Sequence, residues 1–218
     1  MANIRCVLWD WNGTLLDDVG ASLAAVNDML ARRHRPAIDL LAYREAIGVP
    51  IRRFYNIHFD MTQENYPALL SEYSKDYTTH LTKCNLASGA IALLKKLHFT
   101  GVLQVILSSS EQKIVENALA RYNVAQYFDA VLGASDYFAD SKLERAREYL
   151  RVQTPPPKQV LLMGDLVHDF DVAQELGTQC VLVNWGHQGE AQFVRLGAQV
   201  ISSLCELELL PCSPHARG

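Results

Sequence analysis

Four short apolar runs constrain the fold of this 218-residue chain more than any other feature. Each is rich in leucine or β-branched residues and is bounded by polar residues or glycine. Because the apolarity is continuous rather than alternating, the pattern indicates strands buried on both faces, as in a parallel sheet. A further run at 130–134 predicts a shorter strand. The four runs are IRCVLW (4–9), VLQVIL (102–107), QVLLM (159–163) and QCVLV (179–183).

Segments with helical periodicity separate these runs at 89–100, 111–124, 142–152 and 171–177. Alternation of strand and helix predicts an α/β fold, with a doubly wound, mostly parallel sheet and right-handed crossovers. Residues 18–83 break the rhythm, because they show helical patterns but no strand-like run. We therefore expect residues 1–17 and 84–218 to form the core domain, and residues 18–83 to form an inserted helical cap domain.

Charge and composition exclude several classes of partner. The net charge of −4 offers no basic excess for a nucleic acid. The N-terminal apolar run is too short for a signal peptide or a membrane span, so no membrane is expected. Five cysteines without a CxxC pair favour a reducing, cytoplasmic location. The sequence predicts no oligomeric state.

Polar residues follow the predicted strands where each strand ends. Asp10, Ser108 and Asp165 come after the first, second and third runs. Ligands of doubly wound sheets bind outside the carboxyl ends of the strands, so these side chains should share one crevice. Lys142 begins the helix before the third run, and Asp169 follows Asp165 by four residues. Taken singly, each motif is more often a turn, a solvated loop or an acidic helix N-terminus than a functional site.

Four motifs in this order resemble the haloacid dehalogenase superfamily of phosphohydrolases: DWNGT (10–14), VILS ending at Ser108, DSKLERA around Lys142, and GDLVHD (164–169). The resemblance covers nearly the whole chain and is greatest to phosphoglycolate phosphatase-like enzymes with a small helical cap. It implies a Rossmann-like core and a Mg²⁺-dependent phosphohydrolase. The substrate would be a small phosphorylated metabolite, hydrolysed through an aspartyl-phosphate on Asp10.

The residue types suit this chemistry. A carboxylate nucleophile divides hydrolysis into two steps. Mg²⁺ prefers oxygen ligands, which Asp10, Asp165 and the backbone carbonyl of Asn12 would supply. Lys142 would bind the transferring oxygens, and Asp169 would orient Lys142 or a metal-bound water. The expected catalytic residues are Asp10, Asn12 and Lys142. The expected substrate-binding residues are Gly13, Thr14, Ser108, Ser109 and Arg52. For Arg52, the alternative is a position on the solvated face of a cap helix.

Asn12 departs from the phosphatase pattern, which usually has an aspartate here as general acid and base. An amide cannot transfer a proton, and this assistance is worth about 10²–10⁴ in rate. The first interpretation is a slow phosphatase, or one with another base such as His168. A phosphate-binding pseudoenzyme or partner-binding module is the second. A different reaction of the superfamily, of the dehalogenase or phosphonatase type, is the third, although dehalogenases do not need the two acids of GDLVHD.

Overall fold

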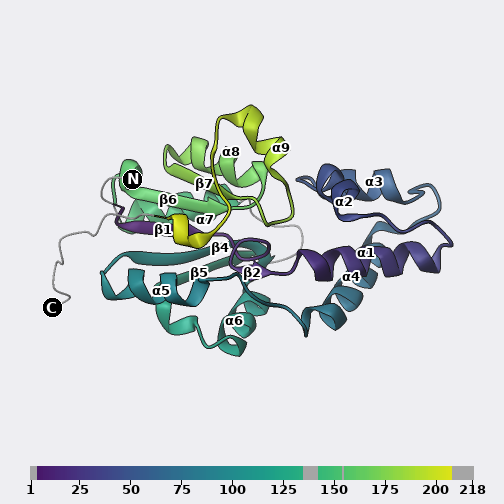
Figure 1. The fold of residues 1–218 in the computed structure, drawn as a ribbon, viewed down its shortest axis with the longest axis horizontal. Coiled ribbons are helices and arrows are strands. Elements are labelled where there is room, and N and C mark those ends of the chain that lie inside the picture. Colours follow the sequence, from purple (N-terminus) through teal and green to yellow (C-terminus); the bar gives the residue numbers. More distant parts are fainter. Residues whose placement is uncertain (1–3, 135–141, 154, 208–218) are drawn as a thin grey trace.

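The computed structural model describes residues 4–134, 142–153 and 155–207. Its centre is a six-stranded sheet in the order β5–β4–β1–β6–β7–β8, with every neighbouring pair parallel (Figure 1). The α/β fold predicted from the apolar runs is therefore confirmed. The strands are β1 (Cys6–Trp9), β4 (Leu103–Glu111), β5 (Ala130–Ala134), β6 (Val160–Gly164), β7 (Gln179–Val183) and β8 (Gln199–Ile201).

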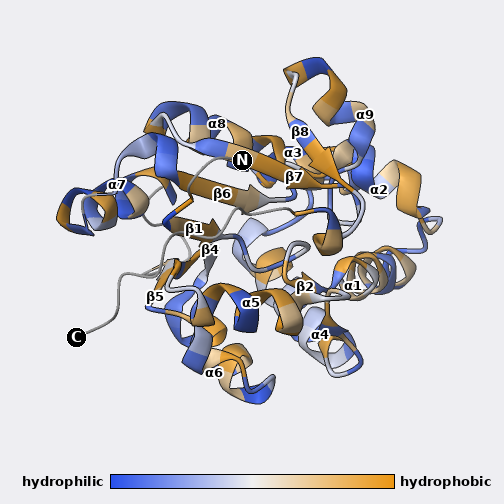
Figure 2. Ribbon diagram, turned by 60° about the vertical axis from the view of Figure 1, so that its left-hand side comes forward, coloured by the Kyte–Doolittle hydropathy of each residue, from blue (hydrophilic) through white to orange (hydrophobic). Residues whose placement is uncertain are grey.

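Helices cover both faces of this sheet, and β1 shows why its apolar run is continuous. Val7 and Trp9 belong to the core cluster formed with α5 and α6, whereas Cys6 and Leu8 belong to the cluster formed with α7 and α8. Successive side chains point to opposite faces, so both sets are apolar. Figure 2 shows the apolar strands between these helices. The helices of this part are α5 (Ala90–Phe99), α6 (Gln112–Arg121), α7 (Lys142–Gln153), α8 (Val167–Leu176) and α9 (Glu190–Phe193).

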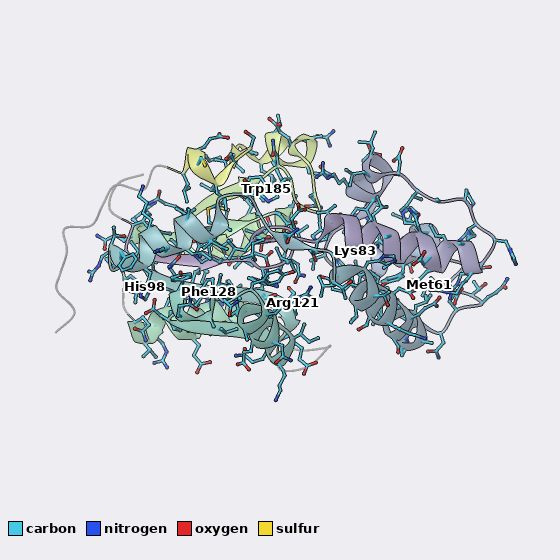
Figure 3. The ribbon with its side chains drawn as sticks, turned by 60° about the horizontal axis from the view of Figure 1, so that its bottom comes forward. Met61, Lys83, His98, Arg121, Phe128 and Trp185 are labelled. Carbon is cyan, nitrogen blue, oxygen red and sulfur yellow. The ribbon has the colours of Figure 1, made fainter. Side chains whose placement is uncertain are left out.

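A second, helical body has its own apolar cluster, which includes Met29, Phe54 and Leu69. Figure 3 shows Met61 in this body, far from His98 and Phe128 beside the sheet. We propose that this body is the cap domain of residues 18–83, inserted into a core of residues 1–17 and 84–218. Its own cluster and the antiparallel strand pair at its base support these boundaries. The elements are α1 (Val19–Arg32), α2 (Leu40–Ala46), α3 (Arg52–His58) and α4 (Tyr66–Leu81), with the pair β2 (Leu16–Asp17) and β3 (Asn85–Leu86) at the base.

Three strand features differ from the prediction. Strand β4 continues past residue 107 to Glu111, which pairs with Ala134 of β5, and the register of the two strands shifts across the three serines between Leu107 and Glu111. Strand β8 has only three residues, too few for a recognisable apolar run. Strands β2 and β3 have two residues each, so they have no periodicity to detect.

No helix in the described ranges is long and apolar enough to cross a membrane.

Candidate active site

Asp10 lies at the carboxyl end of β1, in the centre of the sheet. Its backbone N–H donates to the carbonyl of Met163 in β6 (2.8 Å), which holds the residue at the strand edge. Its side chain is buried, and Thr14 Oγ1 donates to Asp10 Oδ2 (3.2 Å). The buried ammonium of Lys142 donates to Asp10 Oδ1 and, at 2.8 Å, to Asp169 Oδ1. The structure thus brings together four residues that the sequence proposed for one site.

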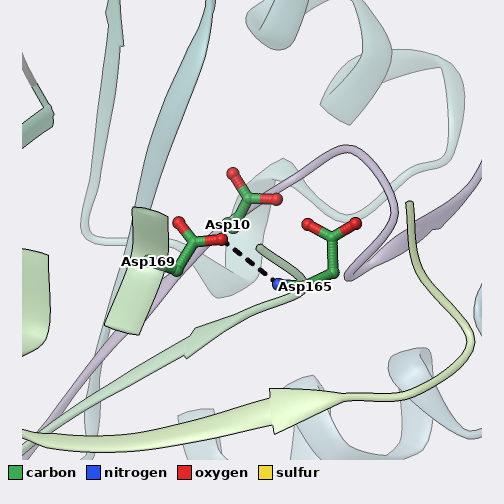
Figure 4. A group of neighbouring side chains, drawn as sticks. All are labelled: Asp10, Asp165 and Asp169. Carbon is green, nitrogen blue, oxygen red and sulfur yellow. Dashed lines mark hydrogen bonds between the residues drawn. The ribbon is translucent and has the colours of Figure 1, made fainter. Parts of the chain in front are cut away.

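Asp165 completes a cluster of three buried carboxylates with Asp10 and Asp169 (Figure 4). One oxygen of each lies within 4.8 Å of the others. Asp169 Oδ2 accepts the backbone N–H groups of Asp165 (3.2 Å) and Leu166 (3.1 Å), which fixes its orientation at the start of α8. Asp165 Oδ2 accepts the N–H of His187 (2.6 Å), whereas its buried Oδ1 has no hydrogen-bond partner among the described residues.

The electrostatics of the cluster follow from burial. Burial raises the pKa of Asp10 to about 6, although Lys142 opposes the shift. Burial also raises the pKa of Asp165, and the charges of Asp10 and Asp169 act in the same direction. The two carboxylates that contact Lys142 hold its pKa above the ordinary value despite burial. Buried carboxylate oxygens, one of them without a partner, fit a hard divalent cation such as Mg²⁺.

Gly13 packs directly against the cluster. Its φ of +73° lies in the left-handed region, and a β-carbon there would stand 2.1 Å from Asp165 Oδ2. Its N–H donates to the carbonyl of Leu16 (3.0 Å) and to Asp18 Oδ1 (2.7 Å). The sequence analysis expects Gly13 to bind the substrate, but the Gly13 N–H is already engaged by Leu16 and Asp18. Because Gly13 has no side chain, Asp165 and His187 can pack against its backbone.

We expect Gly13→Ala to destabilise the protein by more than about 1 kcal/mol, because the new methyl group meets Asp165 and the backbone is strained. Gly20→Ala is the matched control, since Gly20 lies in α1 with open space around it. It should stabilise the protein by about 0.4–1 kcal/mol. Urea unfolding of both variants measures the difference. Equal effects would show that Gly13 has room for a side chain.

Position 12 is enclosed by side chains that the sequence analysis did not single out. Asn12 Nδ2 donates to Asp18 Oδ2 (2.8 Å) and to the hydroxyl of Tyr77 (2.9 Å) in α4. The hydroxyl of Ser110 donates to Asn12 Oδ1 (2.9 Å). Asp18 is close to Asn12 in the sequence, so it is the one partner of Asn12 that the sequence could have indicated. Tyr77 and Ser110 approach from other elements, so only the fold reveals them.

The loop after β7 joins the site to the helical body. His187 Nε2 lies 3.4 Å from Asp18 Oδ1, and His187 Nδ1 lies 2.9 Å from the hydroxyl of Tyr43 in α2. Burial opposes protonation of His187, but Asp18 and Asp165 raise its pKa to about 9. Arg44 of α2 donates to the carbonyl of Trp185 (2.8 Å). This loop therefore contacts both α2 of the helical body and Asp165.

The remaining predicted residues lie in different surroundings. Ser108 is buried in β4, where its hydroxyl accepts the N–H of Ser110 (3.1 Å), and Ser109 is exposed. Arg52 is exposed in α3, with its guanidinium 5.1 Å from the ring centroid of Tyr66. No described hydrogen bond or ion pair joins Arg52 to the carboxylate cluster. Asp140 and Ser141 of the DSKLERA motif lie outside the described residues.

The sequence is similar to known proteins over most of its length. The sequence model of a family described as haloacid dehalogenase-like hydrolase matches residues 7–183. Phosphoglycolate phosphatase 1 of Pseudomonas aeruginosa is 27% identical over 222 residues, which cover 97% of this chain and 80% of that protein. Tyrosine-protein kinase PtkA of Mycobacterium tuberculosis is 26% identical over 192 residues, which cover 87% of this chain and 65% of that protein.

The fold is also similar to solved structures. A haloacid dehalogenase-like family hydrolase from Streptococcus pneumoniae matches with a TM-score of 0.79 and 21% identity. The match covers 92% of this chain and 94% of that one. At this identity, the likeness shows the shared fold.

Proposed function

The chain belongs to the haloacid dehalogenase-like hydrolase family, and we propose that it is a Mg²⁺-dependent phosphatase acting on a small phosphorylated metabolite. The observation that carries the proposal is the buried carboxylate of Asp10, contacted by Lys142 and grouped with Asp165. The relative named phosphoglycolate phosphatase 1 supports a small phosphorylated substrate. The kinase is a weaker guide, because the chain covers only 65% of its length.

The metal follows from the donor set. Asp10, Asp165 and the backbone carbonyl of Asn12 would hold Mg²⁺, and the orphaned Oδ1 of Asp165 supports this assignment. When bound, the ion supplies positive charge between the anionic nucleophile and the anionic phosphate.

The chain's own residues carry the two chemical steps. A carboxylate oxygen of Asp10 attacks phosphorus, and the bond from phosphorus to the leaving oxygen breaks. Lys142 compensates the charge of the phosphoryl oxygens, as its contact with Asp10 favours. Water then attacks the aspartyl-phosphate, which releases phosphate and restores Asp10. Asp169 holds Lys142 in place through its 2.8 Å contact. The proposed substrate contacts are Gly13, Thr14, Ser108, Ser109 and Arg52.

Asn12 limits the rate of this enzyme, because its amide cannot take a proton from water. A phosphate-binding protein without turnover is the second candidate, and the amide at position 12 is the observation that favours it. The proposal also includes a cytoplasmic location, which the four described and unpaired cysteines support. The small substrate is its proposed partner, without nucleic acid or membrane.

A colorimetric assay with an aryl phosphate tests the proposal. We expect turnover in Mg²⁺, and loss of turnover in EDTA and in Asp165→Asn. Calorimetric titration should show Mg²⁺ binding in the wild type and in Asn12→Ala, which keeps its backbone oxygen, but not in Asp165→Asn. Turnover that is equal in EDTA would contradict the metal assignment. Metal binding without turnover on any phosphate would favour the binding protein.

A further inference from the structure

The side chain of Asn12 is fixed in one orientation by its partners. Its Nδ2 donates to Asp18 Oδ2 (2.8 Å), and an ionised carboxylate can only accept. Its Oδ1 accepts from the hydroxyl of Ser110 (2.9 Å). Tyr77 adds a third contact, 2.9 Å from Nδ2. The nitrogen of the amide therefore faces Asp18, and its oxygen faces Ser110.

Asp18 supplies the negative charge of this pair. It is only 1% exposed and accepts hydrogen bonds from the hydroxyl of Tyr77 (2.5 Å) and the N–H of Gly13 (2.7 Å). His187 Nε2 lies 3.4 Å from Asp18 Oδ1, the oxygen that also accepts the N–H of Gly13. With both oxygens engaged by protein groups, Asp18 has no open oxygen with which to protonate a substrate.

The side chains around position 12 favour an amide, because one of them accepts a hydrogen bond from it and another donates one to it. An aspartate there would replace the 2.8 Å N–H···O contact with two carboxylates at that separation, one half-buried at position 12 and one buried at Asp18. Like charges so close cannot both remain ionised without a large cost. Asn12 and Asp18 thus form a pair with a single negative charge, which Asp18 carries.

We propose that this site selects phosphates whose leaving group departs as a stable anion without receiving a proton, which are acyl phosphates and aryl phosphates. The inference rests on the proposed phosphatase function and deepens it. General acid assistance is worth about 10²–10⁴ in rate for leaving groups that need it. The rate of hydrolysis should therefore be reduced most for alkyl phosphates.

The step balances without an acid at position 12. The bond between Asp10 and phosphorus forms, the bond from phosphorus to the leaving oxygen breaks, and the electron pair departs on a carboxylate or phenolate. In the second step water adds to phosphorus and Asp10 leaves as a carboxylate. Both protons of the water end on the released dihydrogen phosphate.

A series of para-substituted phenyl phosphates of the same shape tests the inference in wild-type protein with saturating Mg²⁺. We expect kcat/KM to fall steeply as the leaving phenol becomes a weaker acid. We expect kcat to stay nearly constant, because every substrate passes through the same slowly hydrolysed aspartyl-phosphate. Acetyl phosphate represents the acyl class. An alkyl phosphate should give a kcat/KM about 10²–10⁴ below the best aryl phosphate.

An exchange variant, Asn12→Asp with Asp18→Asn, reverses the pair while it keeps the charge and the hydrogen bond. It should reduce the difference between aryl and alkyl substrates by up to the same factor. Asp17→Asn is the matched control, because Asp17 is an exposed neighbouring carboxylate. In this variant kcat/KM should depend on the acidity of the leaving phenol as steeply as in the wild type. Peptide mass spectrometry of each sample excludes deamidation of Asn12, which precedes a glycine.

The outcomes separate the inference from the proposed function. A wild-type protein that hydrolyses alkyl and aryl phosphates with similar kcat/KM is a phosphatase but overturns the inference. A protein that hydrolyses neither acetyl phosphate nor any aryl phosphate contradicts the proposed function itself. The wild-type series decides the matter even where the exchange variant does not fold.

Discussion

Asp10→Asn is expected to abolish turnover on every phosphate ester, because an amide oxygen is too weak a nucleophile to form the covalent intermediate. The fold should survive, since asparagine has the same shape and its oxygen can still accept from Lys142. Steady-state assays and a thermal unfolding curve measure the two properties. A variant as active as the wild type would show that Asp10 is not the nucleophile.

The second large effect is expected from Lys142→Met. Lys142 is 3% exposed and compensates two buried carboxylates, those of Asp10 and Asp169. Removing one partner of a buried ion pair costs about 3–5 kcal/mol, so the free energy of unfolding should fall by that amount near neutral pH. The loss should shrink as the pH falls, because the uncompensated carboxylates then become protonated. Turnover should fall as well, since the phosphoryl oxygens lose their cation.

Arg147→Met is the control for this prediction. Arg147 forms an exposed ion pair with Glu144 on the same helix, α7. Exposed pairs contribute about 0.2–1 kcal/mol, so this variant should be nearly neutral. Urea unfolding of both variants gives the comparison. If Lys142→Met were as mild as Arg147→Met, the ammonium would not be compensating the cluster.

The apolar runs predicted the sheet because buried parallel strands must be apolar on both faces. That argument worked for β1, β4, β6 and β7, and it failed for β8, which has only three residues. It also ended β4 too early, because a polar side chain such as Ser108 can be buried when the fold supplies a hydrogen bond. Periodicity does not carry that information.

The candidate site also has a part that the sequence predicts and a part that only the structure reveals. Asp10 and Asp165 were predictable because residues at the carboxyl ends of neighbouring parallel strands must converge. The environment of Asn12 was not, since Tyr77 and Ser110 come from the cap and from another strand. The sequence suggested a missing acid, whereas the structure shows an amide paired with the carboxylate of Asp18. Because of this pairing, we expect the rate to depend on the leaving group of the phosphate ester.

The central claim is that Asp10 carries a covalent phosphoryl group during turnover. Rapid mixing with an aryl phosphate and Mg²⁺, followed by acid quench and peptide mass spectrometry, tests it most directly. We expect a phosphorylated peptide that contains Asp10. It should accumulate within the first turnover, because Asn12 cannot help water to attack. Steady hydrolysis with no phosphoryl group on any peptide, or with the group on a residue other than Asp10, would contradict it.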